Sequence, residues 1–114
     1  MAIVGLGFLV GKPISHWLMG KCPEIYLLDQ GSDLKILKQA DLVITGVGKP
    51  GLIKPKMLKN NVLVIDFGYG LENGKIKGDF DATQLTTFSY TLTPGGTGPI
   101  LVAKIFKNFY KLNK

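Results

Sequence analysis

Thr93-Pro94-Gly95-Gly96-Thr97-Gly98-Pro99 is the stretch from which we interpret the rest of the chain. It combines three glycines with two prolines, and it lies between an apolar run and an amphipathic one. A simple reverse turn needs fewer of these residues. A backbone that passes close to a flat ligand and then begins a helix at once needs about this composition. We therefore predict that this stretch and the glycine-rich stretch 5–11 enclose one cofactor and its substrate, and that the intervening chain is their scaffold.

Outward from this stretch, short apolar runs alternate with helical patterns. Strands are predicted at 2–4, 25–28, 41–45, 62–66 and 86–92, and helices at 10–19, 33–39, 55–59 (one turn) and 99–112. The run at 62–66 has the composition of a strand buried on both faces. An Asn-Gly pair at 73–74 predicts a small hairpin over 71–77. The alternation predicts an α/β fold of the Rossmann-like, doubly wound type, a mainly parallel sheet with flanking helices in a single domain, residues 1–114.

Both longer predicted helices carry an apolar stripe. The inner face of the helix at 10–19 is predicted to consist of Val10, Ile14, Trp17 and Leu18, which places His16 in solvent. The stripe of the helix at 99–112 consists of Leu101, Val102, Ile105, Phe106, Phe109 and Leu112, with lysines on the opposite face.

Composition excludes several classes of function. The net charge is +6, but all 14 basic residues are lysines and none is arginine, which disfavours nucleic acid as a partner. The lone Cys22 and the lone His16 allow no internal disulfide and disfavour a transition-metal site. No apolar run reaches the length of a membrane span and no signal peptide is evident, so we expect no membrane partner and a cytoplasmic location.

The first glycine stretch, Gly5-x-Gly7-x-x-x-Gly11, joins a predicted strand to a predicted helix. Gly5 permits a tight turn, Gly7 lets a diphosphate approach the backbone, and the helix N-terminus supplies free N–H groups. Val10 occupies the place of the third glycine in the common dinucleotide fingerprint. The pattern therefore predicts a nucleotide site, and the alternative is a tight strand-to-helix turn without a ligand.

Asp29 ends the second predicted strand, close to the position where an acid binds the ribose hydroxyls of a dinucleotide. Its charge would repel the extra phosphate of NADP, so NAD is the predicted cofactor and NADP is disfavoured. The alternative is an Asx-turn residue before Gly31. We interpret Asp66 and Asp79 as structural carboxylates that bond nearby backbone N–H groups, since the chain shows no nucleophile with a base beside it.

With these residues in view, the chain resembles the NAD(P)-binding domain of methylenetetrahydrofolate dehydrogenase/cyclohydrolase, the bifunctional folate enzyme. The motifs that carry the resemblance span nearly the whole chain: Val10-Gly11-Lys12-Pro13, Ala40-Asp41-Leu42-Val43-Ile44 with Val47-Gly48-Lys49-Pro50, Val64-Ile65-Asp66-Phe67-Gly68, Gly74-Lys75-Ile76-Lys77-Gly78-Asp79 and Pro94-Gly95-Gly96-Thr97-Gly98-Pro99. The family usually has Gly-Arg-Ser or a similar sequence where this chain has Gly5-Leu6-Gly7, a departure that supports either NAD or weaker binding of the cofactor.

The resemblance implies an oxidoreductase that transfers hydride from methylenetetrahydrofolate to NAD(P) in one-carbon metabolism. It implies a set of cofactor-binding residues, which are Gly5, Leu6, Gly7, Phe8, Leu9, Val10, Asp29, Gly46, Val47, Gly48, Pro50 and Gly68. It implies Pro94, Gly95 and Gly98 as the edge that faces folate. No catalytic residue is assigned within these residues, because the family's catalytic lysine belongs to an N-terminal domain that the 114 residues do not include.

Two further expectations follow from the resemblance. The missing domain is the implied partner, together with a second copy of the chain contacting the hairpin at 71–77 in a homodimer. The isolated chain is expected to show no cyclohydrolase activity and at most trace dehydrogenase activity. The alternative interpretation is a stand-alone nucleotide-binding or interaction module that retains the fold.

Overall fold

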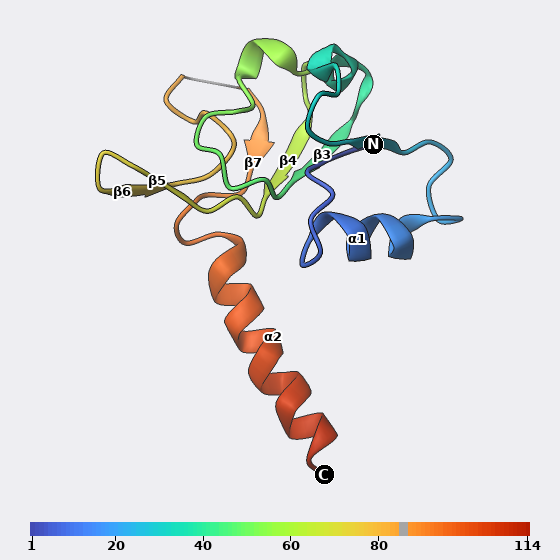
Figure 1. Ribbon diagram of the computed structural model, residues 1–114, viewed down its shortest axis with the longest axis vertical. Helices are drawn as coiled ribbons and strands as arrows, with labels where there is room; N and C mark the ends of the chain where they lie inside the picture. Colours follow the sequence, from blue (N-terminus) through green and yellow to red (C-terminus); the bar gives the residue numbers. More distant parts are fainter. Residues whose placement is uncertain (85–86) are drawn as a thin grey trace.

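The computed structural model describes residues 1–84 and 87–114 and contains a five-stranded parallel sheet (Figure 1). The strand order is β2-β1-β3-β4-β7. The strands are β1 (Ala2–Val4), β2 (Tyr26–Leu28), β3 (Leu42–Thr45), β4 (Leu63–Asp66) and β7 (Ser89–Tyr90). The predicted α/β Rossmann-like sheet is confirmed. Four of the five predicted strands are present, one with the predicted bounds and three shorter by one residue at the N-terminal end. The fifth, predicted at 86–92, is confined to Ser89–Tyr90, and Thr86 lies outside the described residues.

The register aligns the carboxyl ends of the central strands. Val4 pairs with Leu28 on one side and with Thr45 on the other, and Thr45 pairs with Asp66. Each of these residues is the last of its strand, so the loops after β1, β2, β3 and β4 leave the sheet at one level. The loops predicted to bind ligand therefore emerge together, as the parallel arrangement requires.

One face of the sheet holds the hydrophobic core. Val4, Val43 and Val64 are almost wholly buried there. They belong to a cluster with Leu37 and Ile53, which lie in the segments packed over this face. The covering segments are 3-10 helices, η1 (Leu34–Gln39) and η2 (Pro55–Met57), where the sequence predicted a short helix and a helical turn. Asp33 caps η1 by accepting a hydrogen bond from the N–H of Lys35 at 3.0 Å.

Helix α1 (Gly11–Leu18) contacts β1 on the opposite side of the sheet from η1 and η2 (Figure 1). Its buried residues are Gly11 and Ser15 rather than the predicted large side chains. Trp17, which we predicted to be internal, is 64% exposed, and the Lys21 ammonium lies over its ring. The prediction was wrong because the helix approaches β1 closely through its smallest residues, which turns the bulky ones outward.

The predicted hairpin at 71–77 is present. It pairs β5 (Gly70–Glu72) with β6 (Lys75–Lys77) in antiparallel fashion. Asn73 and Gly74 both have positive φ, 53° and 74°, as a two-residue type I′ turn requires.

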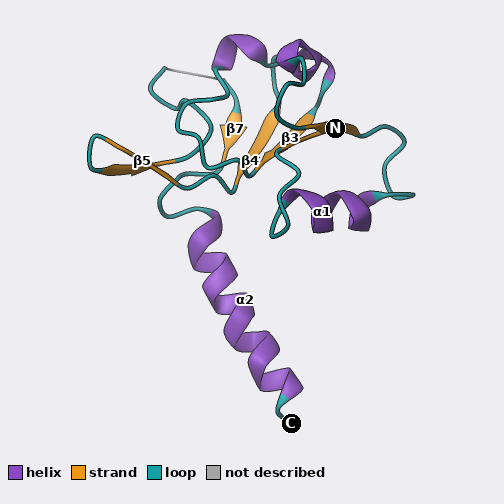
Figure 2. Cartoon of the chain, viewed as in Figure 1, coloured by secondary structure: helices purple, strands orange, loops and turns teal. Residues whose placement is uncertain are grey.

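Helix α2 (Thr97–Leu112) departs most from expectation. It begins at Thr97, two residues before the predicted start at Pro99. None of its residues is buried, and it stands clear of the sheet (Figure 2). Its predicted apolar stripe is exposed, with 60% of Phe109 and 57% of Ile105 accessible. Leu63 of β4 is also 41% exposed, so the prediction that β4 is buried on both faces was wrong as well. Neither described helix is long and apolar enough to cross a bilayer.

Candidate functional site

A cavity of about 450 Å³ lies where the strand order reverses, between the loops that follow β1 and β3. Open parallel sheets bind their ligands at such a switch point. The lining residues come from three separate segments of the chain, at the ends of β1, β2 and β3: Val4, Gly5, Asp29, Gln30, Gly31, Ser32, Leu34, Val47, Lys49 and Leu52. Folding therefore brings Gly5, Asp29 and Val47, which the sequence assigned to one cofactor, into one cavity.

Asp29 lines this cavity, and its carboxylate is not used in the turn that follows β2. The turn after β2 is closed by other groups: the N–H of Ser32 donates to the carbonyl oxygen of Asp29 at 2.9 Å, and the N–H of Asp29 donates to Ser32 Oγ at 3.0 Å. Within residues 1–84 and 87–114, the Asp29 carboxylate accepts no hydrogen bond. The Asx-turn alternative is therefore not what the structure shows, and the carboxylate is available to a ligand.

The first glycine loop packs tightly against α1 and against the loop after β3. A Cβ atom on Gly11 would lie 1.8 Å from the carbonyl oxygen of Gly5. A Cβ atom on Gly5, whose φ is +85°, would lie 2.8 Å from a methyl group of Val47, and one on Gly46 would lie 2.9 Å from Val10. Packing within the chain is therefore sufficient to require glycine at these positions.

Gly7 and Gly98 differ from those glycines. A Cβ atom on either would have no neighbour within 4 Å, and neither residue has a positive φ. Neither the packing of the described residues nor the backbone conformation explains why glycine occupies these two places. Both are positions where the sequence predicted close approach of a ligand, Gly7 to the cofactor and Gly98 to the substrate. The side chains of Phe8 and Leu9 at the loop tip are 85% and 86% exposed.

Two buried carboxylates lie beneath the loops, and both bond backbone N–H groups as the sequence analysis predicted. Asp66 accepts from the N–H of Gly68 at 2.7 Å and from that of Phe80 at 2.9 Å. Burial raises the pKa of the Asp66 carboxyl above its usual range, while these N–H groups act in the opposite direction. Asp79 accepts from Thr45 Oγ1 and from the N–H groups of Val47 and Lys49, each at 2.7 Å.

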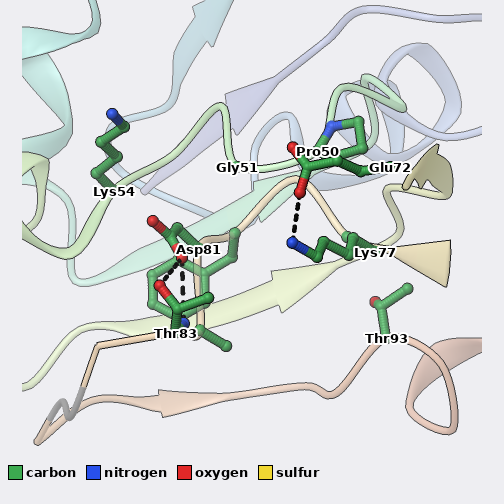
Figure 3. A pocket seen from close by; sticks show the side chains of 11 residues that line it. Pro50, Gly51, Lys54, Glu72, Lys77, Asp81, Thr83 and Thr93 are labelled. Atoms are coloured by element: carbon green, nitrogen blue, oxygen red, sulfur yellow. Dashed lines mark hydrogen bonds and ion pairs between the residues drawn. The ribbon is translucent and has the colours of Figure 1, made fainter. Parts of the chain in front are cut away.

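A second cavity, of about 530 Å³, separates the hairpin from the segment that leads to α2 (Figure 3). Glu72 and Lys77 form an ion pair on one side of it, and Asp81 accepts a hydrogen bond from the Thr83 hydroxyl on another (Figure 3). Pro50 lines this cavity and not the one beside Asp29. Thr93, which directly precedes the predicted substrate residues Pro94 and Gly95, lines it too.

The structure thus divides the predicted site residues among several places. Gly5, Asp29 and Val47 share the smaller cavity, and Pro50 belongs to the larger one. Gly68 has a packing reason to be glycine, because a Cβ atom there would lie 2.3 Å from the Asp79 carboxylate. Sequence reasoning missed Lys49 as a lining residue of the smaller cavity. Its position as the one charged residue in the loop 46–50 was the available signal.

The loop that begins α2 is tied to the end of β4. The Thr97 hydroxyl donates to the carbonyl oxygen of Asp66 at 3.2 Å, and the N–H of Asp66 donates to Thr91 Oγ1 at 2.8 Å. These bonds hold the stretch 93–99 at the carboxyl edge of the sheet, on the same side as the glycine loop after β1 (Figure 1). The edge predicted to face substrate therefore has a defined position.

Comparison with known proteins agrees with this geometry. The model of the tetrahydrofolate dehydrogenase/cyclohydrolase NAD(P)-binding domain matches residues 1–114. The bifunctional protein FolD of Mycoplasmopsis synoviae is 33% identical over all of this chain and 43% of its own length, and that of Staphylococcus aureus is 35% identical over 93% of this chain and 39% of its own.

Solved structures show the same likeness. The bifunctional methylenetetrahydrofolate dehydrogenase/cyclohydrolase of Campylobacter jejuni superposes with a TM-score of 0.88 at 35% identity, over 96% of this chain and 41% of that one. The Trypanosoma brucei enzyme, solved with NADP and an inhibitor, superposes with a TM-score of 0.79 at 25% identity, over 94% of this chain and 40% of that one. The chain therefore spans about two fifths of the length of these relatives.

Proposed function

The chain belongs to the tetrahydrofolate dehydrogenase/cyclohydrolase family as its NAD(P)-binding domain, and from this premise we propose that it holds the dinucleotide for hydride transfer from a methylenetetrahydrofolate substrate. The observation that carries the proposal is the cavity at the β1/β3 switch point, where Gly5, Asp29 and Val47 meet. Leu34 and Leu52 offer this cavity the apolar surface that an adenine ring needs. When bound, the cofactor supplies hydride chemistry, and the chain supplies binding and orientation.

The residues present fit a dinucleotide in three respects. The Asp29 carboxylate is free to accept hydrogen bonds from the ribose hydroxyls. The N-terminus of α1 has no acidic residue in its first turn and no side-chain cap. The N–H groups of Lys12 and Ile14 already donate to backbone carbonyl oxygens, and Pro13 has no N–H. The N–H of Gly11 is therefore the donor that this turn can offer to the diphosphate. Gly7 leaves open space beside that N-terminus.

We assign NAD as the preferred cofactor because Asp29 would lie beside the 2′-phosphate of NADP and repel it. Lys49 lines the same cavity and offsets part of that repulsion, but as a point charge it lacks the bidentate geometry of arginine, which the sequence does not contain. The related Trypanosoma enzyme was solved with NADP, and the proposed preference of this chain for NAD depends on Asp29 and on the lack of arginine.

Calorimetric titration of the purified chain with NAD and with NADP tests both the binding of a dinucleotide and the preference for NAD. Micromolar binding of NAD and weaker binding of NADP are expected. Asp29→Asn should weaken the binding of NAD about 10-fold, which is the effect of losing one hydrogen bond to a charged group. It should also reduce the difference in affinity between NAD and NADP. Asp33→Asn is the matched control, because Asp33 caps η1 and is not a lining residue of the cavity. Absence of binding by the folded chain would contradict the cofactor assignment, and stronger binding of NADP would contradict the NAD preference alone.

The substrate edge is proposed to consist of Pro94, Gly95 and Gly98, with the remainder of the folate site in a lysine-bearing N-terminal domain. The exposed apolar face of α2 supports this partner, since the chain spans only about two fifths of its relatives and α2 finds no cover within the described residues. We propose that α2 packs against that domain. The isolated chain should then show no cyclohydrolase activity and at most trace dehydrogenase activity, and robust turnover by it would contradict this division.

The uncovered α2 also favours the second candidate, a nucleotide-binding interaction module. The two candidates differ in one outcome. If the chain is an enzyme domain, adding the lysine-bearing domain of a relative should restore dehydrogenase turnover. If the chain is an interaction module, the added domain should bind to it without turnover. A homodimer through the hairpin is a further proposal, supported by the exposure of Tyr69 and Leu71, and sedimentation of the chain tests it.

A further inference from the structure

We propose that Asp79 is a positioning residue for the cofactor, because its carboxylate holds the loop 46–50 as one wall of the dinucleotide cavity. This inference rests on the proposed function, since it concerns the same cavity. Asp79 follows β6 and is remote in sequence from the glycine-rich loops 5–11 and 46–50. It is not a lining residue of the cavity, and its exposed fraction is 0%. It therefore acts on the cofactor only through the loop.

Three donors of the β3 strand and its loop converge on this one side chain. Thr45 Oγ1 and the N–H of Val47 both donate to Asp79 Oδ2, and the N–H of Lys49 donates to Oδ1, each at 2.7 Å. Such short bonds to a carboxylate are the strong, charge-assisted kind. They fix the backbone at two alternate residues of the loop, and Val47 and Lys49 are the two residues of that loop that line the cavity.

The direction of these bonds determines what the loop can offer to a cofactor. The N–H groups of Val47 and Lys49 are already committed to Asp79, so the loop does not use them to bind phosphate. Val47 and Lys49 line the cavity, and their side chains and carbonyl oxygens are the groups that they can still offer to a ligand. At the first turn of α1, where the N–H groups of Lys12 and Ile14 are bonded and Pro13 has none, the N–H of Gly11 can still bind an anion.

The surroundings of Asp79 leave little tolerance for another side chain. A Cβ atom on Gly68 would lie 2.3 Å from the Asp79 carboxylate, so the site is closed on that side. All three partners donate, and an asparagine would place its own NH2 group where one oxygen now accepts. At least one loop N–H would then face another donor, and the loop would have to move. In catalysis, a displacement of about 1 Å in a positioning group can cost about 100-fold in rate, and we expect a displaced wall to lower cofactor affinity for the same geometric reason.

The test compares Asp79→Asn with Thr45→Val in the chain of 114 residues, with NADH as the fluorescent probe. Both changes remove hydrogen bonding at the same buried carboxylate, but Thr45→Val leaves the bonds to Val47 and Lys49 in place. We expect Asp79→Asn to lower the affinity for NADH at least about 10-fold. The affinity of Thr45→Val for NADH should remain within about 3-fold of that of the parent chain. Circular dichroism at the titration temperature confirms that each variant is folded.

Each outcome has a distinct meaning. If folded Asp79→Asn binds NADH like the parent, or if Thr45→Val loses as much affinity, Asp79 has only a packing role and the inference is overturned. If the parent chain itself binds no dinucleotide, the proposed function fails first and takes the inference with it.

A second measurement covers the case in which Asp79→Asn does not fold. The amide signals of Val47 and Lys49 are followed by NMR in the parent chain before and after NADH is added. Their downfield positions and slow hydrogen exchange should persist in the complex, because Asp79 keeps both bonds. Loss of that protection on binding would show that the cofactor takes these amides, and would overturn the inference.

Discussion

Gly11→Ala probes the contact on which the proposed cofactor site depends. The new Cβ atom would lie 1.8 Å from the carbonyl oxygen of Gly5, 2.8 Å from its carbonyl carbon and 2.9 Å from Cα of Leu6. All three atoms belong to the backbone of the first glycine loop, so no side-chain rotation relieves the contact. To reach 3.0 Å from the oxygen, α1 must retreat by about 1.2 Å, the difference between 1.8 and 3.0 Å.

The expected cost follows from this displacement. Overpacking of a well-packed contact costs about 3 kcal/mol at the upper end of its usual range, and alanine returns up to about 1 kcal/mol through its better helix propensity. The net destabilisation is about 2 kcal/mol, which lowers the melting temperature by roughly 8 °C for a domain of this size. The same retreat moves the N–H of Gly11 away from the proposed diphosphate site, so cofactor affinity should fall as well.

Gly7→Ala is the matched control, because its Cβ atom meets nothing within 4 Å. It should leave the melting temperature within the few degrees that correspond to about 0.5 kcal/mol, while it weakens dinucleotide binding by occupying the space the diphosphate needs. Thermal unfolding followed by circular dichroism and calorimetric titration with NAD measure both quantities. The reasoning is refuted if Gly11→Ala melts with the parent chain, or if Gly7→Ala binds NAD unchanged.

Three other predictions concern Asp66, Gly98 and Phe109. Because burial raises the folded-state pKa of Asp66 above 3.8, its contribution to stability is fully present below that pH and is lost as the pH rises through the raised pKa. As the pH rises from 3.8 through the raised pKa, chemical denaturation should show the parent chain losing free energy of unfolding relative to Asp66→Asn, by at most about 1.4 kcal/mol per pH unit. A difference between the two chains that does not change with pH would argue against a raised pKa. Gly98→Ala should stabilise the start of α2 by up to about 1 kcal/mol, since its Cβ atom meets nothing within 4 Å, yet impair turnover once a lysine-bearing domain is supplied; unimpaired turnover would remove Gly98 from the substrate edge. Phe109→Lys should change unfolding free energy by less than about 0.5 kcal/mol and abolish association with that domain, which pull-down with the purified domain would measure.

Much of the fold could be predicted from local pattern. The runs around Val4, Ile44 and Val64 are short, apolar and bounded by glycine or polar residues, and each forms a strand of the parallel sheet. The Asn73-Gly74 pair specified its hairpin because few other residues adopt two successive positive φ angles. The position of Asp29 at the switch-point cavity could be predicted because its place after the second strand follows from the order of elements alone.

The packing partners could not be predicted from the same patterns. Periodicity marks an apolar stripe on a helix but does not say what covers it, and so it failed for Trp17, which turns outward, and for α2, which has no cover among the described residues. Hydrogen bonds between distant segments leave no local signal either. Nothing near Asp79 in the sequence indicates that its carboxylate accepts from Thr45, Val47 and Lys49.

The sequence by itself therefore determined the order of strands and helices, the glycine loops and the family to which the chain belongs, because each depends on residues that are neighbours along the chain. Only the tertiary structure decided which of these residues share a cavity, which glycines packing requires, and which side chain holds the loop 46–50. Those properties depend on register and on close approach between segments far apart in sequence. For Gly11 and Asp79 a change of about 1 Å between such segments separates a formed contact from a clash or a lost bond.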